Sequence, residues 1–161
     1  MTQVTKYGRG YKDPNSSLLP IAAYAEGRVR ALASGPIAIA NGDSIASKHY
    51  FGKIASDAIL LPFGCVLTHE AVASVTDYDI GIEKDGTVIS ANVLADGLDI
   101  SSAGTKSGVA AVAAANVGKR LWEILGLSTD PAVEYDVVGV MNAASSAAKS
   151  ISLVLTYSRQ S

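Results

Sequence analysis

Cysteine, histidine, aromatic and charged residues are all scarce in this sequence of 161 residues. The one cysteine, Cys65, can form neither an intrachain disulfide nor a cysteine-based zinc site. Aromatic residues make up 6% and charged residues 17%, whereas hydrophobic residues reach 48%, with alanine and valine as large contributors. Small side chains of this kind suit tightly packed strands and turns better than the core of a large ligand-binding enzyme.

Long apolar runs are also missing. No run approaches the roughly 20 residues that a transmembrane helix needs, and the first 11 residues are too polar for a secretory signal. We therefore expect no membrane contact. The formal net charge of −2 argues against a nucleic-acid partner, for which a strongly basic domain would be expected. A single cysteine fits a reducing compartment.

The charge is unevenly placed along the chain. Residues 1–30 carry a net charge of +3, which leaves −5 for the rest. The cations of this segment are Lys6, Arg9, Lys12, Arg28 and Arg30, and tyrosines such as Tyr7 and Tyr11 lie between them. We predict an extended N-terminal arm over residues 1–30 that a protein surface holds in place, followed by one body over residues 31–161.

Residues 76–90 give the clearest prediction of backbone structure, a β-hairpin. Three apolar residues alternate with polar ones at the period of two expected of a half-buried strand. Asp85-Gly86 follows, the dipeptide favoured in tight hairpin turns, and Thr87-Val88-Ile89 resumes β-prone residues. The predicted inner side chains are Tyr78, Ile80 and Ile82, and the predicted outer ones are Asp77, Asp79 and Glu83.

Further short β-prone segments recur at hairpin-like spacing. They are residues 27–32, 36–40, 45–54, 65–75, 90–99, 135–141 and 151–158, of which we expect the last two to pair with each other. Leu121, Ile124 and Leu125 have one-face helical spacing, with Gly126 placed as a helix C′ residue. Residues 101–116 fit a helix or a loop equally well. The predicted fold is all-β, an antiparallel β-sandwich or jelly-roll-like body with an extended arm and at most one short helix.

Three sites invite a catalytic or metal reading, and each has a simpler explanation. Gly42-Asp43-Ser44 resembles the nucleophile block of GDSL-type esterases, but no histidine follows His69 to act as its base, so we interpret it as a turn. Asp77 and Asp79 lack the further oxygen ligands that calcium or magnesium requires. Cys65 and His69 would lie about 13 Å apart along a strand, which is too far for a catalytic pair. We predict no catalytic residue, metal or cofactor.

One resemblance to a known family covers roughly residues 37–158. It is carried by the block Leu121-Trp122-Glu123-Ile124-Leu125-Gly126 through Pro131, read with Thr76–Gly81, Leu94–Gly97 and the terminal segment Ile151–Tyr157. In this order the blocks resemble the head decoration, or cement, proteins of tailed bacteriophages, which are encoded near the major capsid protein. These blocks are packing and turn patterns, not catalytic residues.

The resemblance implies a structural virion protein, made in the host cytoplasm, that binds the outer capsid surface and bridges capsid subunits. Its partner would be the major capsid protein, and a trimer would fit a threefold position. The predicted capsid-binding residues all lie in the basic arm: Lys6, Tyr7, Arg9, Tyr11, Lys12, Arg28 and Arg30. The alternative is a β-sandwich module that binds carbohydrate or a receptor. Such sites usually present exposed aromatics, whereas we expect Trp122 in the core.

Overall fold

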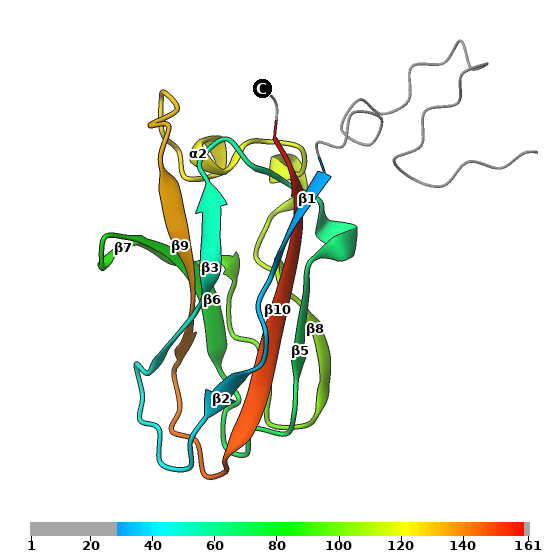
Figure 1. Ribbon diagram of the computed structural model, residues 1–161, viewed down its shortest axis with the longest axis vertical. Coiled ribbons are helices and arrows are strands. Elements are labelled where there is room, and N and C mark those ends of the chain that lie inside the picture. The colour runs from blue at the N-terminus through cyan, green and yellow to red at the C-terminus, as the bar shows by residue number, and fades with distance from the viewer. Residues whose placement is uncertain (1–28, 160–161) are drawn as a thin grey trace, which may run out of the picture.

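Residues 29–159, the part that the computed structural model describes, form two antiparallel β-sheets packed face to face (Figure 1). Sheet A has the order β1 (Val29–Ala33), β10 (Lys149–Ser158), β5 (Val66–His69) and β8 (Gly104–Ser107), and two short strands, β2 (Ile37–Ile39) and β4 (Ile59–Leu60), also pair with β10. Sheet B has the order β3 (Lys48–Ala55), β9 (Glu134–Met141), β6 (Tyr78–Lys84) and β7 (Thr87–Ala95). The predicted all-β sandwich is confirmed.

The core lies between the two sheets. It is filled by the inward side chains of alternating strand positions, and the following have no exposed surface: Leu67, Leu153 and Leu155 from sheet A, and Tyr78, Ile80 and Val137 from sheet B. Because successive side chains of a strand point to opposite faces, the residues between them form the outer faces of the sandwich. The inward positions predicted for Tyr78, Ile80 and Ile82 are confirmed.

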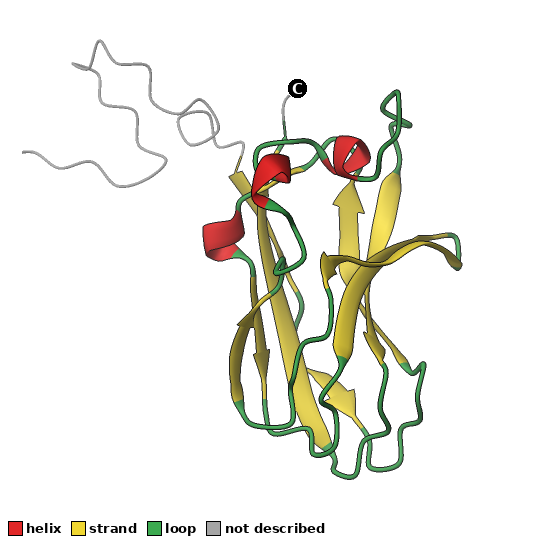
Figure 2. Cartoon of the chain, turned by 180° about the vertical axis from the view of Figure 1, so that it is seen from behind, coloured by secondary structure: helices red, strands yellow, loops and turns green. Residues whose placement is uncertain are grey.

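The hairpin between β6 and β7 is also confirmed. Asp85 and Gly86 connect the strands with φ values of 51° and 79°, the left-handed conformation that this turn needs at both positions. The pairing of β6 with β7 is irregular, because its register shifts twice. Shifts of this kind bend a strand. The tip of this hairpin projects from the side of the sandwich, as both views show (Figures 1 and 2).

The pairing of the last two strands differs from the prediction. β9 lies in sheet B between β3 and β6, whereas β10 lies in sheet A, where it pairs with β1, β2, β4 and β5. The connection of residues 142–148 therefore crosses from one sheet to the other. Hydrophobic alternation predicted both strands correctly but does not tell which strand a neighbour in sequence will join.

Helical structure is short within the described residues. α2 (Leu121–Ile124) confirms the predicted helical turn, and Gly126 follows it with a φ of 73°. The undecided stretch 101–116 contains β8, turns and the 3-10 segment η2 (Ala114–Asn116) rather than an α-helix. A second 3-10 segment, η1 (Pro62–Gly64), precedes β5. Figure 2 shows these segments in connections outside the two sheets.

Candidate docking surface

The outer face of sheet B carries a buried carboxylate, that of Glu83. This side chain is only 3% exposed, although strand alternation predicted it in water. It accepts hydrogen bonds from the Lys48 ammonium and, at 3.0 Å, from the Tyr50 hydroxyl, both on β3. The prediction for Glu83 is therefore wrong about burial and right about the face. Alternation reports which face a residue occupies, not whether another segment covers that face.

These contacts favour the ionised form of Glu83. The hydrogen bond from Lys48 is the main cause that lowers its pKa; desolvation opposes the effect, and the Tyr50 hydroxyl adds to it. The same contact with Glu83 raises the pKa of Lys48 and of Tyr50. An ion pair and a phenol hydrogen bond thus connect β3 to β6 across the outer face of β9, which lies between these two strands. Tyr50 itself is 53% exposed, so an aromatic ring faces outward above this cluster.

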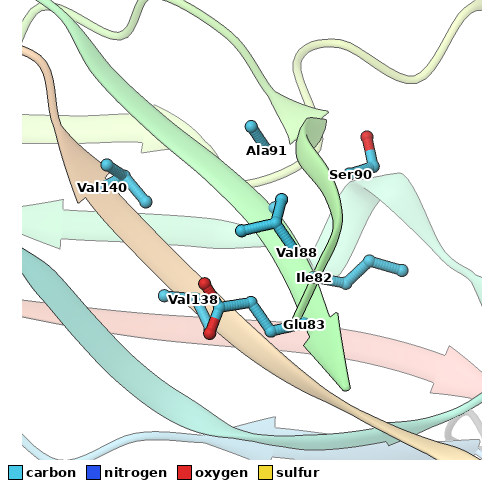
Figure 3. A pocket seen from close by; sticks show the side chains of 8 residues that line it. Ile82, Glu83, Val88, Ser90, Ala91, Val138 and Val140 are labelled. Carbon is cyan, nitrogen blue, oxygen red and sulfur yellow. The ribbon is translucent and has the colours of Figure 1, made fainter. Parts of the chain in front are cut away.

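A small apolar groove lies beside Glu83 (Figure 3). Its cavity volume is only about 30 Å³. Its lining residues come from the three strands β6, β7 and β9: Gly81, Ile82, Glu83, Val88, Ser90, Ala91, Val138 and Val140. Pockets that bind drug-sized molecules are usually about 300–1,000 Å³. A groove of this size suits a side chain of a partner better than a metabolite.

The groove exists because β7 folds over the outer face at Gly81. A Cβ at this position would overlap the backbone of Ser90 and Ala91, and the nearest atoms are main-chain atoms that cannot rotate away. Glycine is the one residue that allows this close backbone approach. The crossing strand also covers Val138, which is 1% exposed although it points to the outer face. The sequence offered one signal for this, a glycine inside a strand.

The residues of the esterase-like block form a turn, as predicted. The Asp43 carboxylate accepts the Ala40 N–H at 2.8 Å, which closes the turn of residues 40–43 immediately before Ser44. His49 Nδ1 lies 3.1 Å from the Tyr78 hydroxyl, and the two rings stack in the core. Burial lowers the pKa of His49. The hydrogen-bond partner of this histidine is therefore a core phenol and not the serine.

The two carboxylates of the Asp-x-Asp pair share one partner. The Asn142 amide donates to Asp77 Oδ1 at 3.0 Å and to Asp79 Oδ2 at 2.8 Å. Asp79 also accepts the Gly97 N–H at 2.8 Å. Across residues 29–159, no group of three or more histidine, cysteine or acidic side chains is arranged to hold a metal ion. The pair ties three loops together at one end of the sandwich.

Cys65 and Trp122 differ in burial. Cys65 is 1% exposed, and its thiol donates to the Leu61 and Thr156 carbonyls. Burial raises the pKa of this thiol, which disfavours the reactive thiolate. Trp122, predicted in the core, is instead half-buried on α2. Its indole Nε1 is shielded from solvent and has no hydrogen-bond partner among the described residues.

A second cavity lies near α2 and is polar. Asp57 and Arg159 form an ion pair on one side of it, with Arg159 Nε 2.9 Å from Asp57 Oδ1. On the other side the Ser56 hydroxyl donates to Asp130 at 2.6 Å, and this hydrogen bond is the main cause that lowers the pKa of Asp130. Each of these charged groups already has a partner. The polar groups that line this cavity connect segments of the chain that are far apart in the sequence.

The predicted arm residues Lys6, Tyr7, Arg9, Tyr11, Lys12 and Arg28 lie outside the described residues, so their role stays a prediction. Arg30 lies within β1 and is exposed. The division of the chain at residue 30 likewise stays a prediction. No helix in residues 29–159 is long and apolar enough to cross a membrane.

Comparison with known proteins gives one structural likeness. No protein-family model matches the chain, and no curated protein matches it. Among solved structures, the chain is similar to one from a structure described as a Cyanophage Pam1 capsid asymmetric unit, with a TM-score of 0.54 and 16% sequence identity. The superposition covers 93% of this chain and 98% of the other, so the two chains correspond over almost their whole lengths. At this identity the likeness establishes a shared fold.

Proposed function

We propose that this chain is a structural protein of a bacteriophage virion, a decoration or cement protein that binds the outer capsid surface and bridges capsid subunits. The carrying observation is the whole-length likeness to a chain of a phage capsid asymmetric unit. The likeness covers 93% of this chain and 98% of the other, so it is not confined to one segment of either chain. The residue patterns that resemble phage decoration proteins point the same way.

The surface of the described body is consistent with this proposal. The groove beside Glu83 is small and apolar, and the exposed Val88 lines it, which suits contact with a protein surface. The major capsid protein is the proposed partner, and the mechanism is mass action. A protein that binds only the assembled shell stabilises that shell by its binding free energy, and many copies multiply a modest contact.

The arm, residues 1–30, is the part that we propose reaches a neighbouring molecule. Its net charge of +3 opposes the −5 of the remaining chain, and Tyr7 and Tyr11 supply amphipathic contact area between the cations. An acidic body that carries a basic arm is suited to bind a neighbour of its own kind or an acidic patch of the shell.

Deletion of residues 1–17 tests this role. Heads decorated with the shortened chain should retain fewer copies after centrifugation and should release DNA at a lower temperature than heads with the full chain. A matched control changes Ser16 and Ser17 to alanine, which keeps every cation and tyrosine of the arm, and it should be retained like the full chain. Unchanged occupancy and unchanged heat resistance after deletion would refute the role of the arm while leaving the binding of the body to be measured separately.

A further inference from the structure

The four edges of the two sheets differ in charge. Within the described chain, sheet A ends at β1 and β8, and sheet B ends at β3 and β7. Three of these strands carry cations: Arg30 on β1, Lys48 and Lys53 on β3, and Lys106 on β8, which is only four residues long. Charged side chains and short length are the usual protection of an edge against pairing with another chain. β7 has neither, since its nine residues contain no charge and no proline.

β7 is also exposed and apolar. Val88 is 52% exposed and Ile89 43%. Among residues 29–159 this strand pairs only with β6, and its far end is closed where the Ala111 N–H donates to the Leu94 carbonyl. The register shifts lie between Val88 and Ser90 and between Ser90 and Ala95. The turn end of β7, which includes Val88 and Ile89, therefore lies toward the projecting tip of the hairpin (Figure 1). An uncharged, β-branched edge in this position is a template for an added strand.

The same chain contains a segment of matching composition. Residues 14–25 carry no charge. Residues 18–25 are mostly aliphatic and include one proline, Pro20, and one tyrosine, Tyr24. The cations Lys6, Arg9 and Lys12 precede this segment. An uncharged segment can pair with this apolar edge without burying a charge against it, and residues 18–25 are uncharged.

The charges set the direction of the added strand. β7 ends at Ala95, where Asp96 follows and Asp79 holds the Gly97 N–H at 2.8 Å. If the segment runs antiparallel to β7, the residues that precede Leu18 reach this acidic end. The cations of the arm then face Asp79 and Asp96. A parallel strand would carry them to the opposite end, where Asp85 already pairs with Lys84 at 2.9 Å.

We propose that β7 accepts residues 18–25 of a neighbouring copy of this chain as an added antiparallel strand. The neighbour, and not the same copy, supplies the segment because of reach. Only residues 26–28 separate Ala25 from the start of β1 at Val29, a span of about 13 Å when extended. Figure 1 shows the start of β1 and the tip of the β6–β7 hairpin on opposite sides of the molecule. The inference takes from the proposed function only that the arm reaches a neighbour.

Sedimentation equilibrium of the purified full-length chain, with no capsid present, tests the exchange. The wild type should self-associate. Ile89→Lys, which places a charge on the edge, and Ala23→Pro, which removes a donor from the segment, should each weaken association at least tenfold. Val117→Lys is the matched control, because Val117 is 55% exposed and lies outside every sheet edge, and it should associate like the wild type. Thr87→Lys replaces Ile89→Lys as the edge variant if the latter does not fold.

Mixing the two variants distinguishes exchange between copies from contact within one copy. Ile89→Lys keeps an intact segment and Ala23→Pro keeps an intact edge, so an equimolar mixture should recover a complex that neither variant forms alone. A monomeric wild type, variants that associate like the wild type, or a mixture that stays monomeric would each overturn the proposal. Since no shell is needed, this outcome is independent of whether the chain binds phage heads.

Discussion

The two outer faces of this sandwich are built on the same strand geometry and differ in what covers them. On sheet A several outward side chains of β1, β5 and β10 are small, uncharged and open to solvent: Ala31, Ala33, Thr68 and Val154 are all exposed. On sheet B the bend of β7 closes over the face, so that Val138 and the carboxylate of Glu83 are buried without entering the core. Alternation therefore does not determine whether an outward side chain is exposed, since a bent edge strand can bury part of an outer face.

The largest effect should come from Gly81, where the two faces differ most. Gly81→Ala places a Cβ against the backbone of β7 and should destabilise the fold by about 2–3 kcal/mol, the usual cost of forced overpacking. Gly104→Ala is the control on sheet A, because a Cβ there has no atom within 4 Å. Urea denaturation of both variants measures the difference. Equal stabilities would show that β7 does not rest on sheet B.

A smaller effect is expected from one substitution made on both faces. Val138→Thr replaces a buried methyl group by a hydroxyl that must be desolvated. It should lower the free energy of unfolding by about 1–2 kcal/mol. Val154→Thr on sheet A, where the side chain is 37% exposed, should change stability by less than about 0.5 kcal/mol. The comparison fails if the two variants unfold at the same urea concentration.

Glu83 should contribute a pH dependence specific to sheet B. Its folded pKa is lowered, so its contribution to stability is present above the unfolded pKa of about 4.3 and is lost as the pH falls through the folded pKa. Wild type and Glu83→Gln should therefore differ in unfolding free energy near pH 6 and converge below pH 4. A difference that stays constant with pH would exclude an ionised Glu83 as its cause.

His49, on the opposite side of β3, should produce the smallest change. Burial lowers its folded pKa, so the unfolded state binds a proton more readily and stability falls as the pH drops below the unfolded value of about 6.5. The loss levels off below the folded pKa. Thermal unfolding of wild type and His49→Phe between pH 7 and 5 should show a steeper decline for the wild type, and parallel curves would contradict it.

Much of the fold was predictable because its signals are local. Alternation at Tyr78, Ile80 and Ile82 and the Asp85-Gly86 turn determine a hairpin whatever surrounds them. β8 gave no such signal, because its four residues, Gly104–Ser107, are all exposed and carry no apolar alternation. The assignment of β9 and β10 to different sheets depends on contacts far apart in sequence, which no local pattern encodes.

The candidate surface was harder to predict than the fold. Sequence reasoning placed the binding residues in the arm and gave no binding role to Tyr50, Lys48 or Val88, because these residues come together from different strands. Lys48 and Glu83 are 35 positions apart and meet only through the order β3-β9-β6 of sheet B. The bulges of β7 that make the groove depend on register, which is a property of the pair of strands and not of either one.

The most direct test of the proposed virion role is co-sedimentation of the purified chain with heads of the phage that encodes it. Expanded heads from which the chain has been removed should bind it saturably, with a fixed number of copies for each head, and unexpanded shells should bind less. Addition of the chain should also raise the temperature at which these heads release DNA. A chain that stays in the supernatant at all concentrations, with heads no more heat-resistant than before, would contradict the proposal.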